Sequence, residues 1–321
     1  MLYQNSVPFS PNFVLKNKHL NTAYRYYFSS IKIEFSRKRM HTKDGDFLDL
    51  DFSTANSDNV IIAIHGLEGS SNSTYIQSLT KKANANNFDV IAINLRSCSG
   101  EPNNLLSSYH SGKSEDLVEV IQYIENNFNY NNIHVVGYSL GGNITLKYMG
   151  EVGESSSVKT AIAVSVPCSL KGSSIAMAKK DNKLYVNNFL KTLIVKANEK
   201  FAKFPNSDLN IEKIRAAKNF SDFDNNYTAP AHGFKDANDY YEKSSCTQFL
   251  KDIKKPTLLI TSLDDPFLNE ECFPIKEAKN SKHFHLLTTK YGGHVGFCEY
   301  FNMKKNNWLE NQILSFIENN N

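Results

Sequence analysis

The segment Gly137-Tyr138-Ser139-Leu140-Gly141 lies directly after the apolar residues 133–136 (IHVV) and directly before residues 143–149 (NITLKYM). The flanking segments are typical of a buried strand and a helix. A G-x-S-x-G pentapeptide is common by chance, but between a strand and a helix its small residues allow a tight reversal that strains the serine. That geometry exposes the hydroxyl of Ser139 above the sheet, whereas the alternative is a serine that caps a helix in a glycine-rich turn.

Strands and helices alternate on both sides of this motif. The apolar runs are short and continuous, as in strands buried on both faces of a parallel sheet. The alternation predicts an α/β fold, with a mostly parallel sheet and helices on both faces. We expect strands at 60–65, 89–95, 133–136, 160–166, 257–261 and 283–287, and helices at 74–84, 114–128, 143–149 and 308–317. Helix 114–128 is expected to begin with Ser114 as its N-cap.

Two segments depart from this alternation. Residues 31–52, with a turn at 43–45 (KDG), indicate antiparallel strands that extend one edge of the sheet. Residues 168–250 contain one helical stripe at 183–204 and then an aromatic, acid-rich stretch. An irregular insertion between two strands is a common place for a substrate-covering cap. We therefore expect a single domain over residues 1–321, interrupted by a helical cap at 168–250.

His294 lies in YGGHVGF (291–297), after the last expected strand. A serine hydroxyl is a poor nucleophile at neutral pH and needs an imidazole to accept its proton. Glycines on both sides would let this loop bring the imidazole close to Ser139. Most of the nine histidines should be surface or packing residues, and the position after the last strand is what distinguishes His294.

Two adjacent acids, Asp264 and Asp265, follow the expected strand 257–261. An acid can hold the imidazole in the correct tautomer and stabilise its protonated form. Neighbouring side chains at a strand end point apart, so only one of the two can face His294. We favour Asp265, because Ser262 provides a small residue three positions earlier and a turn follows. The chain order Ser, Asp, His is that of the α/β-hydrolase fold.

An oxyanion site in this fold needs two backbone amides. One is that of Leu140, directly after the candidate nucleophile. The other should come from the loop after strand 60–65, where HGLEG (65–69) makes Leu67 the expected donor. Glu68 in that loop is expected to hold the loop rather than to take part in chemistry.

These motifs together resemble the YheT-like branch of the α/β-hydrolases, over nearly the whole chain. The quoted segments are long and occur in the family order: HGLEGSSNSTY (65–75), NLRSCSGEPN (94–103), GYSLGGN (137–143), FDNNYTAPAHGFKDANDYYEKSS (223–245), DDPF (264–267) and GGHVGF (292–297). The resemblance implies a triad of Ser139, Asp265 and His294. The chain departs from the family at Ser97, where Gly is usual, and at Asn21, where Gln is usual.

The family resemblance implies hydrolysis of carboxylic esters, often with lipid-like or medium-chain acyl groups. Some relatives pass the acyl group to an alcohol instead, so an acyltransferase with the same triad is the alternative. A non-catalytic binding protein with the same fold is a third possibility. We interpret Cys98 as a packing residue and His110 as a residue that caps the following helix or packs, rather than as catalytic groups. The aromatic residues of the cap either form an apolar pocket wall or dock the cap on the core: Phe220, Phe223, Tyr227, Phe234, Tyr240 and Tyr241.

The composition indicates which classes of partner to exclude and which cellular compartment to expect. The chain has 321 residues, with 36 Lys and Arg against 33 Asp and Glu, a net charge of +3. The sequence has no long basic run that could bind a nucleic acid or an anionic membrane surface, so neither is expected as the main partner. The five cysteines are scattered, with no zinc or disulfide pattern. We expect no cofactor, no metal and no integral membrane segment. Without a signal-peptide pattern at residues 1–20, we expect a cytoplasmic location; the oligomeric state stays open.

Overall fold

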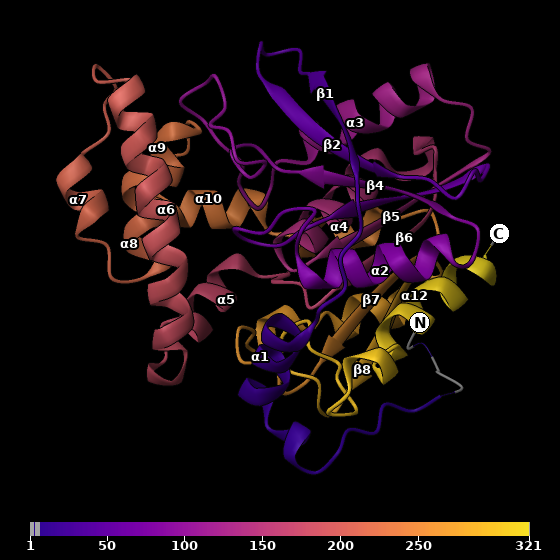
Figure 1. The fold of residues 1–321 in the computed structure, drawn as a ribbon. Coiled ribbons are helices and arrows are strands. Elements are labelled where there is room, and N and C mark those ends of the chain that lie inside the picture. The colour runs from indigo at the N-terminus through magenta and orange to yellow at the C-terminus, as the bar shows by residue number, and fades with distance from the viewer. Residues whose placement is uncertain (1–2, 4–6, 321) are drawn as a thin grey trace.

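The computed structural model describes residue 3 and residues 7–320; positions 1–2, 4–6 and 321, which include part of the segment searched for a signal peptide, lie outside the described residues. The described chain forms an eight-stranded sheet with the order β1-β2-β4-β3-β5-β6-β7-β8 (Figure 1). Its strands are β1 (Ser36–His41), β2 (Phe47–Ser53), β3 (Asn59–Ile64), β4 (Asp89–Asn94), β5 (Asn132–Tyr138), β6 (Val158–Val164), β7 (Thr257–Ser262) and β8 (Phe284–Thr289).

The neighbours from β4 to β8 pair in parallel, which confirms the predicted α/β fold with a mostly parallel sheet. Residues 60–64 of β3 are buried throughout, as expected for a strand covered on both faces. Strand ends differ from the prediction by up to two residues. β6 ends at Val164 rather than at 166, because Ser165 has a positive φ of 52° that takes the chain out of the strand.

The expected antiparallel edge is present. β1 pairs with β2, and β2 pairs antiparallel with β4, so this pair extends the sheet beyond its parallel part. The turn between β1 and β2 closes with hydrogen bonds from the Gly45 amide to the Thr42 carbonyl and from the Thr42 amide to the Asp46 carbonyl.

Helices cover both faces of the sheet. On one face, α3 (Ser114–Asn127) and α4 (Leu140–Val152) pack their apolar residues against the strands, with a residue of α11 (Ile275–Asn280). On the other face, α2 (Thr74–Asn84) and α12 (Trp308–Glu318) form a second cluster. α1 (Lys18–Phe28) contacts α2 and carries Arg25, which forms a buried ion pair of 2.6 Å with Glu310 of α12.

Helix α3 begins at Ser114, but not in the way that the sequence indicated. The preceding residue, Lys113, is the N-cap and makes no capping hydrogen bond with its side chain. The Ser114 hydroxyl instead donates to Glu151 at 2.5 Å and accepts from Lys147 at 2.9 Å, both on α4. Ser114 therefore joins α3 to α4, and the expected N-cap role is wrong.

The segment between β6 and β7 is helical for most of its length. It contains α5 (Leu170–Met177), η3 (Lys180–Asn182), α6 (Lys183–Lys203), α7 (Ile211–Arg215), α8 (Phe220–Phe223), η4 (Asp224–Thr228), α9 (Ala229–Ala231), α10 (Ala237–Ser244) and η5 (Cys246–Asp252). In Figure 1, α6 to α9 stand together beside the sheet, around an apolar cluster largely their own. Among the described residues, no helix is both long enough and apolar enough to cross a membrane.

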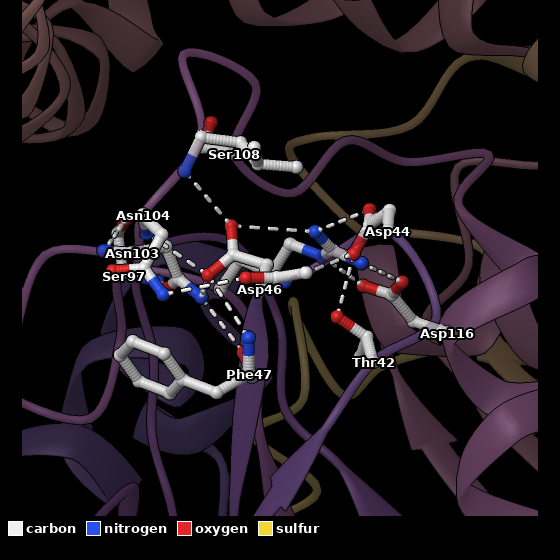
Figure 2. Close-up of polar contacts among 12 residues, drawn as sticks. Thr42, Asp44, Asp46, Phe47, Ser97, Asn103, Asn104, Ser108 and Asp116 are labelled. Atoms are coloured by element: carbon white, nitrogen blue, oxygen red, sulfur yellow. Dashed lines mark hydrogen bonds and ion pairs between the residues drawn. The ribbon is translucent and has the colours of Figure 1, made fainter.

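A buried polar network links the sheet to this helical segment. The guanidinium of Arg96 forms an ion pair of two hydrogen bonds with Asp116, at 2.7 and 2.8 Å, and also contacts Asp44 and Asp46. In Figure 2 the carboxylates of Asp44, Asp46 and Asp116 point toward the same group, which is the guanidinium of Arg96. Asp46 in turn accepts hydrogen bonds from residues 103–105. The ammonium group of Lys200 on α6 donates to the carbonyls of Asn103 and Leu105, so the network reaches the inserted helices.

We predict that Arg96→Met lowers the free energy of unfolding by about 3–5 kcal/mol, because buried Asp46 and Asp116 would lose their cation. Urea unfolding measures this change. Arg215→Met is the matched control, since the Arg215–Glu212 pair is exposed, and it should change stability by less than about 0.5 kcal/mol. A cost below about 1 kcal/mol for Arg96→Met would show that the network is not needed for stability.

Candidate active site

Ser139 lies between the end of β5 and the start of α4, in a strained backbone conformation. Its φ is 52° and its ψ is −117°, values that non-glycine residues rarely adopt. The turn is tight: a Cβ atom added to Gly141 would come 2.5 Å from the Ile64 carbonyl oxygen. The amide of Ser139 donates to the Val164 carbonyl at 2.8 Å, which fixes the turn to β6.

His294 is held in a loop that two hydrogen bonds attach to distant elements. Its amide donates to the Thr22 hydroxyl on α1 at 2.8 Å, and the next amide, of Val295, donates to the Ser165 hydroxyl at 3.0 Å. Gly293, just before it, has a φ of 61°, and a Cβ atom there would come 2.5 Å from the Lys18 carbonyl oxygen. The Nε2 atom of His294 lies 3.0 Å from the Oγ of Ser139.

The two adjacent acids have different neighbours. Asp265 is 4% exposed, and its Oδ2 lies 2.9 Å from Nδ1 of His294. Its other oxygen accepts from the Phe267 amide at 2.9 Å, which orients the carboxylate. Asp264 instead accepts from the Gly293 amide at 3.0 Å, so it supports the loop that carries His294 without facing the imidazole. Burial raises the pKa of Asp264.

The loop after β3 comes close to Ser139. A Cβ atom added to Gly66 would lie 3.1 Å from the Cβ of Ser139. In this loop the amides of Gly66 and Glu68 donate to tyrosine hydroxyls, and that of Gly69 donates to the Gly66 carbonyl. Leu67 is therefore the amide that remains in the described loop 66–69. Leu140 is the first residue of α4, where helix amides have no partner within the helix.

Glu68 connects this loop to the inserted helices. Its backbone has a positive φ of 54°. One carboxylate oxygen accepts from the Tyr109 hydroxyl at 2.7 Å and from the Lys196 ammonium of α6 at 2.8 Å, while the Glu68 amide donates back to Tyr109 at 2.9 Å. The sequence singled out Glu68 as a residue that holds the loop, but it missed Tyr109 and Lys196. Periodicity places Lys196 on a helix without showing what that side chain meets.

The imidazole of His65 connects the start of the same loop to the residue that follows β4. Its Nε2 accepts from the Leu95 amide at 3.1 Å, and its Nδ1 lies 2.7 Å from the Gly66 carbonyl oxygen. Nε2 must therefore be unprotonated, with the proton on Nδ1. Burial lowers the pKa of His65 to about 4, so the neutral form is the native one.

The two positions that depart from the family pattern both lie in buried hydrogen-bond networks. Ser97 has a positive φ of 61°, a region that glycine enters without steric cost. Its amide donates to the Asn103 side chain, and its hydroxyl accepts from the Asn103 amide at 3.3 Å. Asn21 donates to the carbonyls of Leu15 and Cys298 and accepts from the Cys298 amide, so it fixes the chain just after the loop of His294.

A cavity of about 570 Å³ opens in front of Ser139 and His294. Five of the six aromatic residues considered as a pocket wall line it: Phe220, Phe223, Tyr227, Tyr240 and Tyr241. The sixth, Phe234, packs against Tyr240 instead. Exposed Tyr26 and Tyr27 of α1 also line the cavity, so α1 contributes to its wall.

Cys98 and His110 have packing partners near the cavity. The Cys98 thiol lies 3.4 Å from the Lys196 ammonium, and burial raises its pKa, which makes it a poor nucleophile. His110 packs against His232 and Tyr240. Within residue 3 and residues 7–320, no cluster of three or more His, Cys, Asp or Glu side chains could hold a metal ion.

Comparison with known proteins gives matches over most of the chain. The alpha/beta hydrolase fold family matches residues 59–294. The chain is 33% identical over 321 residues to the YheT protein of Escherichia coli, covering 98% of this chain and 94% of that one. It is 28% identical over 284 residues to the medium-chain fatty acid ethyl ester synthase/esterase 2 of Saccharomyces cerevisiae, covering 80% and 61%. The solved esterase PF2001 of Pyrococcus furiosus shares the fold, with a TM-score of 0.61 and 17% sequence identity. The match covers 98% of this chain and 99% of that one.

We predict a pH dependence of stability that depends on His65. The folded pKa of about 4 lies below the unfolded value of about 6.5, so the unfolded chain takes up the proton first. The contribution of this residue is fully present above pH 6.5 and is lost as the pH falls toward 4, by up to about 3 kcal/mol. Urea unfolding between pH 7 and pH 4 measures the loss.

His65→Gln removes the titrating group and should reduce the dependence on pH over this range. His41→Gln removes an exposed histidine of β1 and serves as the control, which should leave the wild-type dependence in place. An equal pH dependence in the wild type and in His65→Gln would contradict the assignment.

Proposed function

The chain belongs to the α/β-hydrolase family, in its YheT-like branch of carboxylic ester hydrolases, and we propose that it cleaves esters through Ser139, His294 and Asp265. The observation that carries the proposal is the continuous contact from Ser139 Oγ to His294 Nε2 at 3.0 Å and from His294 Nδ1 to Asp265 at 2.9 Å. A hydroxyl, an imidazole and a carboxylate in this order form the arrangement that activates a serine.

The proposed reaction has two steps. Ser139 Oγ attacks the ester carbonyl carbon while Nε2 of His294 takes the hydroxyl proton, and that proton then passes to the leaving alcohol. The resulting acyl-enzyme is cleaved by water, which His294 activates in the same way. Asp265 keeps the proton on Nδ1, so Nε2 is free to accept, and it stabilises the imidazolium that forms.

We propose that the amides of Leu67 and Leu140 bind the oxyanion in both steps. Two observations support this assignment: the close approach of the Gly66 backbone to Ser139, and the position of Leu140 at the N-terminus of α4, whose dipole favours negative charge. Lys196 and Tyr109 are positioning residues in this proposal, because they hold Glu68 next to Leu67.

An apolar acyl group fits the cavity. Its wall contains the rings of Phe189, Phe220 and Phe223 and the aliphatic side chains of Leu170 and Leu193. The name of the yeast relative, a medium-chain fatty acid ethyl ester synthase/esterase, agrees with lipid-like or medium-chain acyl groups. Burial of such a chain in an apolar cavity contributes roughly 0.8 kcal/mol for each methylene group.

We propose that residues 168–250 form a cap within one domain of residues 1–321. Its helices supply one wall of the cavity and reach the core through Lys196 and Lys200. A cytoplasmic location is also part of the proposal, supported by five free thiols, which a reducing compartment keeps unpaired.

Acyl transfer to an alcohol is the second candidate function. The observation that favours it is the name of the yeast relative, which includes ester synthesis as well as hydrolysis. Both functions use the same acyl-enzyme and differ only in the group that attacks it.

We predict that Asp265→Asn lowers kcat for p-nitrophenyl butyrate by about 10³–10⁴-fold, because the imidazole would lose its tautomer and its charge partner. Asp264→Asn is the matched control next to it. An asparagine there still accepts from the Gly293 amide, so its effect should stay below about tenfold.

Labelling with a fluorophosphonate probe gives a second measurement on the same variants. The folded wild type should be labelled at Ser139, and Ser139→Ala should not be labelled. Equal rates for the two aspartate variants, or no labelling of the folded wild type, would refute the proposed triad.

We predict that the main product is the free acid. With p-nitrophenyl butyrate and ethanol in buffer, hydrolysis yields butyric acid, whereas transfer yields ethyl butyrate. Gas chromatography of the products separates the two. A predominance of ethyl butyrate at an ethanol concentration well below that of water would assign the chain to acyl transfer instead.

A further inference from the structure

Asp224 places a carboxylate in the wall of the cavity that holds Ser139 and His294. It is the first residue of the π-helical turn η4, and π-turns are frequent at functional sites. Its Oδ1 accepts from the Thr228 hydroxyl at 2.6 Å, and its Oδ2 accepts from the Tyr241 hydroxyl at 2.7 Å. Both partners are neutral, and the proposed mechanism uses none of the three residues.

The carboxylate of Asp224 has no cation beside it among the residues that the structure describes. Two other buried acids have a cation, since Asp116 pairs with Arg96 and Glu310 pairs with Arg25, whereas buried Asp89 accepts hydrogen bonds from two backbone amides and a hydroxyl. Burial raises the pKa of Asp224 to about 6, and the hydrogen bonds from the two hydroxyls oppose that rise. A desolvated negative charge without a counter-ion is costly, and a cation bound in the cavity would remove that cost.

Aromatic side chains line the same cavity as Asp224. Tyr240 and Tyr241 line it with ring centroids 5.3 Å apart, and Phe223 and Tyr227 line it with the same separation. The faces of aromatic rings attract cations, most strongly those that are poorly hydrated, such as alkylated ammonium groups. A carboxylate among such rings combines the charge and the apolar contact that an alkylammonium group needs.

We propose that Asp224 and the surrounding rings of Tyr227, Tyr240 and Tyr241 form a binding site for an alkylated ammonium group carried by the substrate. The proposal rests on the proposed function in one respect, because it takes the cavity in front of Ser139 as the substrate site. It adds a class of substrate: esters that join an apolar acyl chain to a part with a positive charge.

Binding of a matched pair of ligands tests this site without any turnover. Hexyltrimethylammonium carries the charge, and hexyldimethylphosphine oxide is a neutral compound with a head of similar size. Calorimetry on the wild type should give at least about tenfold tighter binding of the ammonium compound. Equal affinity for the two ligands overturns the proposal, and this comparison requires no variant.

Two variants test whether Asp224 supplies the negative charge that binds the ammonium group. Asp224→Asn should remove the preference for the ammonium compound and leave the affinity for the neutral compound within about twofold. Asp208→Asn makes the same change in charge at an exposed cap position outside the cavity, and the preference should persist in it. A preference that survives in Asp224→Asn with a wild-type circular dichroism spectrum overturns the assignment to this residue.

Enzyme kinetics place the ligand in the cavity. Hexyltrimethylammonium should inhibit the hydrolysis of p-nitrophenyl butyrate competitively, and non-competitive inhibition would show that it binds elsewhere and overturn the proposal. The two proposals fail separately. If the wild type binds the ammonium compound selectively but hydrolyses no ester, the esterase proposal fails while the ammonium site stands.

Discussion

The close approach of three segments at Gly141 is the constraint on which the site depends. A Cβ atom at position 141 would lie only 2.5 Å from the carbonyl oxygen of Ile64, at the end of β3. β3, β5 and the start of α4 can therefore meet only around glycine, and this meeting holds Ser139 at its positive φ. The same approach brings the loop of Leu67 next to Ser139. Ser139 and the loop of Leu67 are thus positioned by the same close packing around Gly141 and Gly66.

A second layer of contacts connects that centre to the inserted helices. Asp46 joins Arg96 to the loop of residues 103–105, whose carbonyls receive Lys200. Glu68 joins Tyr109 to Lys196, one helical turn before Lys200. Arg96 and Lys196 have carboxylate partners, and Lys200 donates to carbonyl oxygens, so each of these cations has polar partners that offset the cost of its desolvation. The geometry around Ser139 therefore depends on residues far from it in the sequence.

The sequence predicted the mostly parallel sheet, the positions of its strands along the chain and the serine turn, because these follow from local apolar runs and from one pentapeptide in context. It also selected Asp265 from two adjacent acids, and in the structure that is the acid beside His294. It missed Lys196, Tyr109 and Asp224. Their partners are supplied by segments that meet only after folding, and no periodicity encodes such a meeting. Ser114 was wrongly predicted for the same reason. Serine is a common N-cap residue, but in the folded protein the Ser114 hydroxyl donates to Glu151 of α4 instead.

The two lysines of α6 also bear on how molecules enter and leave the cavity. Lys196 is held by a carboxylate and Lys200 by carbonyl oxygens, so outward rotation of the helix would separate two ammonium groups from partly buried partners at once. Such an opening is slow compared with the rotation of surface side chains. Tyr26 and Tyr27 of α1, by contrast, are exposed where they line the cavity, so their rings can turn without separating buried charges. Movement of α6 is therefore the more costly way to widen the cavity, and movement of these two rings is the less costly way.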